Sequence, residues 1–269
     1  MKLIQKVLTK HGISHAVESA VVKRRTRSPP VRTLGLDINT NSTGYVVLSQ
    51  TGQVDTFGHI STKHLQSDGQ ILDIGVAIAN RLIQVKQEGG SNVSWEVGIE
   101  DFLRTFARGQ FHTKGLFQLA QLNGLVSYCA LTSFGAKPLH VHPTSARNFF
   151  SLKTPAATTN GTARKKDAIK HVVMAHFQSK EPQLNLDVIP GPARLDIADA
   201  YVIASYTWWQ AIVDHVVSDE SWQNEELWHE METKVAKQIA KSSDKETYMT
   251  TLFRNEVEQF VRDNHQDHI

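Results

Sequence analysis

Three short apolar runs separated by polar turns constrain the fold of this chain more than any other feature. The runs cover 33–36, 44–48 and 54–60, and the segments between them are rich in Asn, Thr, Ser and Gly. A short turn can join antiparallel strands, whereas parallel strands need a crossover of roughly a dozen residues or more. The sequence therefore predicts three consecutive antiparallel strands.

The chain downstream of residue 60 alternates between helical and strand patterns. Apolar residues at helical spacing predict helices over 68–88, 113–131, 164–177 and from about 193, and two further strands are predicted over 95–99 and 138–141. Together these elements indicate an α/β fold in which helices flank a mixed five-stranded sheet. Two acidic helices, over 222–241 and 244–262, are predicted to form a C-terminal hairpin.

Charge is distributed unevenly behind a formal net charge of +2. Residues 1–32 hold eight Lys/Arg and one acid, net +7, whereas 214–269 hold thirteen acids and six bases, net −7. The basic, amphipathic start resembles a mitochondrial transit peptide, with a plastid or a nucleoid as other compartments, and a disordered basic tail that binds nucleic acid is the alternative. Three segments are expected: a basic targeting or disordered segment over 1–32, the α/β domain over 33–213, and an acidic helical extension over 214–269. No apolar run approaches the roughly 20 residues that span a membrane.

Four carboxylates stand in positions that predict a metal site. Asp37 and Glu100 each close an apolar strand pattern, and Asp196 and Asp199 lie three residues apart, on one face of a helix. Each alone is explained more readily by a turn, a cap or a solvated helix face than by a metal site. Together they are typical of nucleases that use two metal ions, because such sites need several oxygen ligands and Mg²⁺ prefers oxygen.

Other residue types are less informative about metals. The single cysteine, Cys129, excludes an internal disulfide and a cysteine-based zinc site. His140 and His142 alternate at the end of a predicted strand without an obvious third ligand, and are interpreted as ordinary polar residues.

Five stretches carry a resemblance to a known family: LGLDINTNSTGYVVL (34–48), GIEDF (98–102), LAQLNGLV (119–126), GTARKKDAIKHVV (161–173) and LDIADAYVIA (195–204). They resemble the RuvC-type Holliday-junction resolvases of the RNase H-like superfamily. The resemblance implies a Mg²⁺-dependent endodeoxyribonuclease that resolves four-way DNA junctions as a homodimer, with helix 113–131 at the interface. It also implies two Mg²⁺ ions per site, for which Mn²⁺ can substitute, held by Asp37, Glu100, Asp196 and Asp199.

Basic residues near these acids are expected to contact the DNA. By resemblance, Lys166 acts beside the scissile phosphate. Arg147 stands where the family is expected to have a second basic residue near that phosphate. The remaining expected DNA contacts are Lys153, Arg164, Lys165, Lys170, Arg104 and Arg108, with Phe102, Phe106 and Phe111 as candidates for stacking on unpaired bases.

Departures from the family pattern leave alternatives open. Asp37-Ile38-Asn39 replaces the usual Asp-Pro-Gly, and the segment after Glu100 is longer. One alternative is a non-catalytic nucleic-acid-binding or assembly factor, for example in an organellar ribosome, that docks a protein partner through Trp222 and Trp228. Another is a nuclease for RNA or RNA–DNA hybrids. An actin-like ATPase, which begins similarly, would need a second glycine-rich phosphate-binding strand pair that the sequence does not contain.

Overall fold

The protein is described here by a computed structural model covering residues 2–65, 71–101, 113–154 and 162–264, with side chains omitted at position 2, over 113–114 and over 162–167. It divides into two compact units. The core unit is Arg27–Trp208, and the terminal unit combines Met1–Thr26 with Trp209–His268. Each unit is described by itself.

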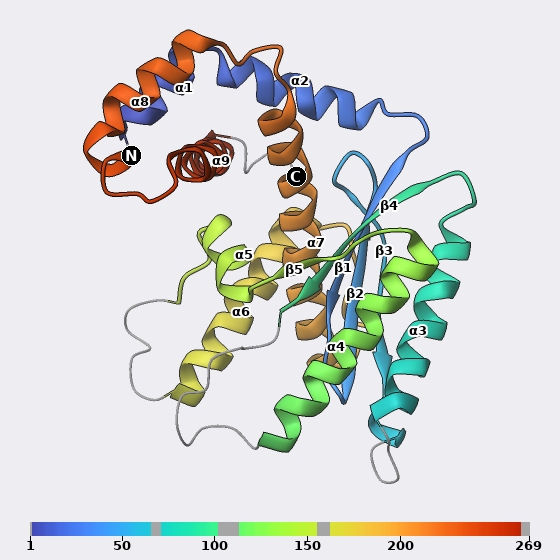
Figure 1. Ribbon diagram of the computed structural model, residues 1–269. Helices are drawn as coiled ribbons and strands as arrows, with labels where there is room; N and C mark the ends of the chain where they lie inside the picture. The colour runs from blue at the N-terminus through green and yellow to red at the C-terminus, as the bar shows by residue number, and fades with distance from the viewer. Residues whose placement is uncertain (1, 66–70, 102–112, 155–161, 265–269) are drawn as a thin grey trace. The chain divides into compact units, whose positions relative to one another are not determined.

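The core unit is built on a five-stranded mixed sheet, as the sequence predicts (Figure 1). Its strands are β1 Val31–Asp37, β2 Ser42–Leu48, β3 Val54–Ser61, β4 Ser94–Glu100 and β5 Leu139–Val141. They lie in the order β3-β2-β1-β4-β5. The pairs β1–β2 and β2–β3 are antiparallel, whereas β1–β4 and β4–β5 are parallel. The predicted RNase H-like arrangement, three antiparallel strands followed by parallel ones, is confirmed.

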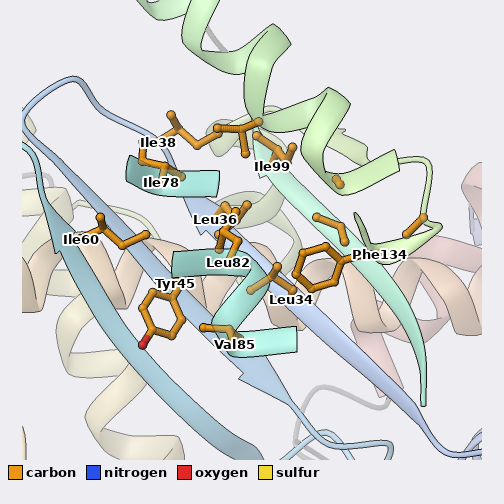
Figure 2. Packing of buried hydrophobic residues seen from close by; sticks show 14 of the residues in the cluster. Leu34, Leu36, Ile38, Tyr45, Ile60, Ile78, Leu82, Val85, Ile99 and Phe134 are labelled. Carbon is orange, nitrogen blue, oxygen red and sulfur yellow. The ribbon is translucent and has the colours of Figure 1, made fainter. Parts of the chain in front are cut away.

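One face of this sheet is covered by α3 (Ile71–Glu88) and α4 (Thr113–Phe134). Figure 2 shows Leu34 and Leu36 of β1 packed against Ile78 and Leu82 of α3, within a buried apolar cluster that also contains residues of α4. Because successive strand residues point to opposite faces, the apolar positions 34 and 36 place 35 and 37 on the other side of the sheet.

The opposite face carries the first part of α7 (Gly191–Ser218). Gly35 of β1 permits this packing, since a Cβ there would overlap the backbone of Ala200 and Ala204 in α7. Next to α7 lies α6 (Thr162–Lys180), whose Phe177 stacks on Tyr201 of α7 with ring centroids 4.6 Å apart.

A short helix, α5 (Pro143–Phe149), follows β5 and was not predicted. Pro143 occupies its first turn, where a missing N–H costs nothing, and the His142 ring accepts a hydrogen bond from the Thr144 amide at 3.2 Å. His140 also has an ordinary polar partner, with its Nε2 lying 3.3 Å from the Ser127 hydroxyl. Arg147 is therefore held by a regular helix of the core unit and does not lie in a loop.

The terminal unit groups segments that the sequence analysis treats separately. Residues expected to be a targeting or disordered segment form α1 (Lys2–Lys10) and α2 (Ile13–Arg25), which fold together with α8 (Glu225–Ile239) and α9 (Lys245–Asn264). The buried apolar side chains that α1, α8 and α9 contribute include Ile4, Val7, Leu8, Leu227, Met231 and Val257. The grouping has a physical reason, because α1 packs against helices that are far away in the sequence.

Polar contacts join the same helices. The Gln5 side chain donates a hydrogen bond to the Glu256 carbonyl oxygen at 2.8 Å, and Lys10 pairs with Glu230 at 2.8 Å. The excess positive and negative charges of the two chain ends thus meet within one unit.

The C-terminal hairpin is present as predicted, and its tryptophans are half-buried. The ring centroids of Trp222 and Trp228 lie 5.5 and 5.0 Å from that of Phe253 in α9. Each ring thus packs on α9 and keeps part of its surface exposed. Among the helices of the described ranges, none combines the length and apolar character required to cross a membrane.

Candidate metal centre

Asp37 and Glu100 lie at the ends of two neighbouring parallel strands. The preceding residues, Leu36 and Ile99, are register partners, and both side chains belong to the apolar cluster of Figure 2. Strand alternation therefore turns both carboxylates to the face that α7 covers. There the two side chains interact directly, and Glu100 raises the pKa of Asp37. The buried Asn123 amide donates to the Glu100 carbonyl oxygen at 2.9 Å and holds the end of β4 in place.

The other two carboxylates come from the first turns of α7. Asp199 is buried, with 6% of its surface exposed, and Asp196 is half-buried. Gly44 of β2 brings the sheet and helix together at this point, because a Cβ at Gly44 would overlap the Asp196 backbone. The small residue on the strand thus determines how close the helical carboxylates approach β1.

Electrostatic interactions link all four carboxylates. Burial, followed by repulsion from Glu100, Asp199 and Asp196, raises the pKa of Asp37 well above its ordinary value. The pKa of Glu100 is also raised, first by burial and then by Asp199. Burial likewise raises the pKa of Asp196. Nearby positive charges would lower these pKa values, so the raised values mean that the negative charge of the carboxylates is only partly neutralised by the residues around them.

Two basic side chains offset part of this negative charge. Arg147 of α5 donates from its guanidinium to Asp199 Oδ1 at 2.8 Å, and Lys170 of α6 lies 3.7 Å from Asp196 Oδ1. Both also lower the pKa of Glu100. Arg147 and Lys170, predicted as DNA contacts, therefore point into the carboxylate cluster itself.

The donor set fits a hard divalent cation such as Mg²⁺ or Mn²⁺. The side chains that converge here present carboxylate oxygens, which these ions prefer. The buried Ser42 hydroxyl lies close to the Asp196 carboxylate and lowers the pKa of that acid.

The remaining predicted residues are placed only in part. Lys153 is exposed, in the segment after α5. Arg164, Lys165 and Lys166 belong to α6, but their side chains lie outside the described residues. Five expected DNA contacts also lie outside the described residues: Phe102, Arg104, Phe106, Arg108 and Phe111.

Sequence reasoning missed Ser42 and Asn123, both of which support the cluster. Ser42 was interpreted as a turn residue, and Asn123 stands inside a helical pattern that is otherwise rich in apolar side chains. A buried amide on that helix could have indicated a polar partner at a strand end, because buried amides are costly without one.

The sheet order and the carboxylate cluster define an RNase H-like α/β protein with a candidate divalent-metal centre. No family model matches the chain, and no curated protein matches it. Among solved structures, RuvC of Thermus thermophilus in complex with a Holliday junction substrate is 13% identical, with a TM-score of 0.43 over 66% of this chain and 94% of that chain. A second Thermus thermophilus RuvC structure is 15% identical, with a TM-score of 0.43 over 66% and 95%. The yeast mitochondrial Holliday junction resolvase Ydc2 is 14% identical, with a TM-score of 0.38 over 76% and 96%.

Proposed function

We propose that this protein is a metal-dependent endonuclease that cuts four-way DNA junctions. The observation that carries the proposal is the convergence of Asp37, Glu100, Asp196 and Asp199, which come from two strands and a helix, on one face of the sheet. Their mutual repulsion is a standing cost to the fold that bound cations would offset. The choice of branched DNA as substrate rests on the sequence resemblance to the RuvC-type resolvases.

The residues have separable roles in the proposed reaction. The four carboxylates would hold Mg²⁺ or Mn²⁺, which supplies activation of water and neutralisation of charge on the phosphate when bound. Lys170 orients Asp196 through its ion pair, and both Lys170 and Arg147 add positive charge beside the reacting phosphate. Lys166, one helical turn before Lys170, is the proposed further phosphate contact.

A symmetric junction calls for two active sites, and the exposed surface of α4 supports a homodimer. Phe117, Tyr128 and Leu131 of this helix are 63%, 67% and 54% exposed. These side chains recur at intervals of 11 and 3 residues, which keeps them on one side of a helix. An exposed apolar stripe of this kind is typical of a protein interface, and a two-fold interface would present two metal centres to one junction.

The direct test uses the full-length protein and a labelled synthetic four-way junction with Mg²⁺. Paired nicks at symmetric positions are expected, and they should disappear with Asp199→Asn, which removes one ligand charge at nearly constant size. Val188→Asn, a change at an exposed residue before α7, serves as the matched control. Linear duplex and RNA–DNA hybrid are assayed in parallel.

Other outcomes would redirect the assignment. Junction binding without cleavage, equal in wild type and Asp199→Asn, would favour a non-catalytic binding or assembly role. Cleavage confined to the hybrid would support the metal-dependent mechanism but identify the RNA–DNA hybrid, not the four-way junction, as the substrate.

The proposed compartment is the mitochondrion, which the basic, acid-poor composition of residues 1–32 supports. The C-terminal helical extension, 214–269, is proposed as the contact for a protein partner.

A further inference from the structure

A pocket of about 280 Å³ opens between α5, the segment that follows α5, and α6. Its polar lining consists of Thr144, Arg147, Asn148, Lys153 and Thr154, and two apolar side chains complete it. The described residues that line it thus include two cations and no acid. Since hydroxyl and amide groups stand beside those cations, the lining is suited to an anion with several acceptor oxygens.

Arg147 belongs to this pocket and to the carboxylate cluster at the same time. Its Nη2 atom donates to Asp199 at 2.8 Å, while the side chain remains 22% exposed and lines the pocket. A guanidinium matches the geometry of both carboxylates and phosphates, and forms its strongest contacts when it binds either in a bidentate manner. An anion in the pocket therefore competes with Asp199 for the same donor group.

We propose that the pocket binds a backbone phosphate of the nucleic acid substrate and that Arg147 couples its occupancy to cation binding by the carboxylates. Without substrate, Arg147 neutralises Asp199 and competes with the cation for that ligand. A phosphate in the pocket attracts the guanidinium and leaves Asp199 available. The cation therefore binds more tightly once the strand is in place, and this inference rests on the proposed function.

A phosphodiester is favoured over free phosphate by the place of the pocket. It shares Arg147 with the centre at which a phosphodiester would react, so a neighbouring phosphate of the same strand arrives with the substrate. Thr144, Asn148 and Lys153 are exposed, which leaves the lining accessible to a continuous chain. The neighbouring ion pair of Lys170 with Asp196 lies one residue from Ile169, another lining residue of the pocket.

The test measures calcium binding to the full-length protein by isothermal titration calorimetry. Ca²⁺ is the probe because it takes oxygen ligands, and a gel of each sample verifies that the junction is intact. Titrations are made with protein alone, with a saturating four-way junction, and with inorganic phosphate. By reciprocal linkage, the junction should tighten Ca²⁺ binding by about tenfold.

Three variants separate this coupling from general electrostatics. Arg147→Gln should bind Ca²⁺ more tightly than wild type without DNA, because the competing cation is gone, and should respond less to the junction. Lys153→Gln should keep the wild-type affinity without DNA and lose part of the response. Lys137→Gln, an exposed lysine just before β5, is the charge-matched control and should behave as wild type. Thermal melts verify that each variant is folded.

The outcomes distinguish the inference from the proposed function. If neither wild type nor Arg147→Gln binds Ca²⁺, the metal centre itself is wrong. If Ca²⁺ binds but the junction does not change its affinity, or if Arg147→Gln weakens binding without DNA, the coupling is overturned and the centre stands. An equal response to inorganic phosphate would overturn the assignment of the pocket to a nucleic-acid phosphate.

Discussion

Asp37 and Glu100, at the ends of adjacent parallel strands, interact directly at the edge of a buried sheet face, and Glu100 raises the pKa of Asp37. Two acids in such contact cannot both be ionised without mutual repulsion, and burial adds to the cost. The fold tolerates this arrangement because the sheet and α7 are held together by apolar packing. The centre is therefore a locally unfavourable feature of the metal-free protein.

The first prediction concerns the stability of Asp37→Asn. Replacing this acid with a neutral amide removes like-charge repulsion, so the metal-free variant should unfold at a higher temperature than wild type. A gain of about 0.5–2 kcal/mol is expected, with a rise in Tm of a few degrees. Differential scanning calorimetry in EDTA measures it. The same variant should lose metal-dependent stabilisation and nuclease activity, and a lower Tm in EDTA would contradict the repulsion argument.

The second prediction follows from the raised pKa values of Asp37 and Glu100. A raised folded-state pKa means that the folded protein binds the proton more tightly than the unfolded chain, so these groups favour folding increasingly as pH falls through that pKa. Cation binding has the opposite dependence, because it displaces protons. Calcium affinity should therefore increase with pH beyond the ordinary carboxylate range of about 4. A constant affinity from about pH 5 to 8 would contradict the proton competition.

The third prediction tests the role of α1 in the terminal unit. Leu8 is completely buried, whereas Leu3 on the same helix is 50% exposed. Leu8→Ala should destabilise the terminal unit by about 2–5 kcal/mol, while Leu3→Ala should have little effect. Urea unfolding followed by tryptophan fluorescence measures the difference, since Trp222 and Trp228 report on this unit. Equal effects of the two substitutions would mean that α1 does not pack as described.

The fourth prediction concerns the exposed stripe on α4. Tyr128→Glu places a charge in the middle of the proposed dimer interface and should shift the protein towards the monomer. Val188→Glu, at a position 80% exposed outside α4, is the control for added charge. Sedimentation velocity measures the oligomeric state. A wild-type protein that is monomeric at all concentrations would remove the homodimer from the proposal.

The sheet was predictable because its signals are local. Turn residues separate the first three strands, and helical spacing marks α3 and α6 within a few residues of their observed bounds. The place of the carboxylates followed from the same logic, since Asp37 and Glu100 each come directly after an apolar strand pattern.

The parts that sequence reasoning missed depend on contacts between distant segments. The helices α8 and α9, which α1 contacts, lie more than 200 residues away in the sequence, so α1 read alone was indistinguishable from a basic leader. The ion pair of Arg147 with Asp199 joins two helices whose packing has no local signal. The position of Arg147 could be inferred by resemblance, whereas its contact could not.

The alternation along β1 has a consequence for how such a protein can evolve. Leu34 and Leu36 pack in the apolar core on one face of the sheet, while Asp37 lies on the opposite face, in the candidate metal centre. Substitutions at the metal centre should therefore leave the packing of the core unchanged. A lineage could lose the acids one at a time, gaining thermal stability at each step, and retain a folded nucleic-acid-binding scaffold. Selection for a charged ligand would be the force that opposes this drift, and the four acids are the positions at which it would act.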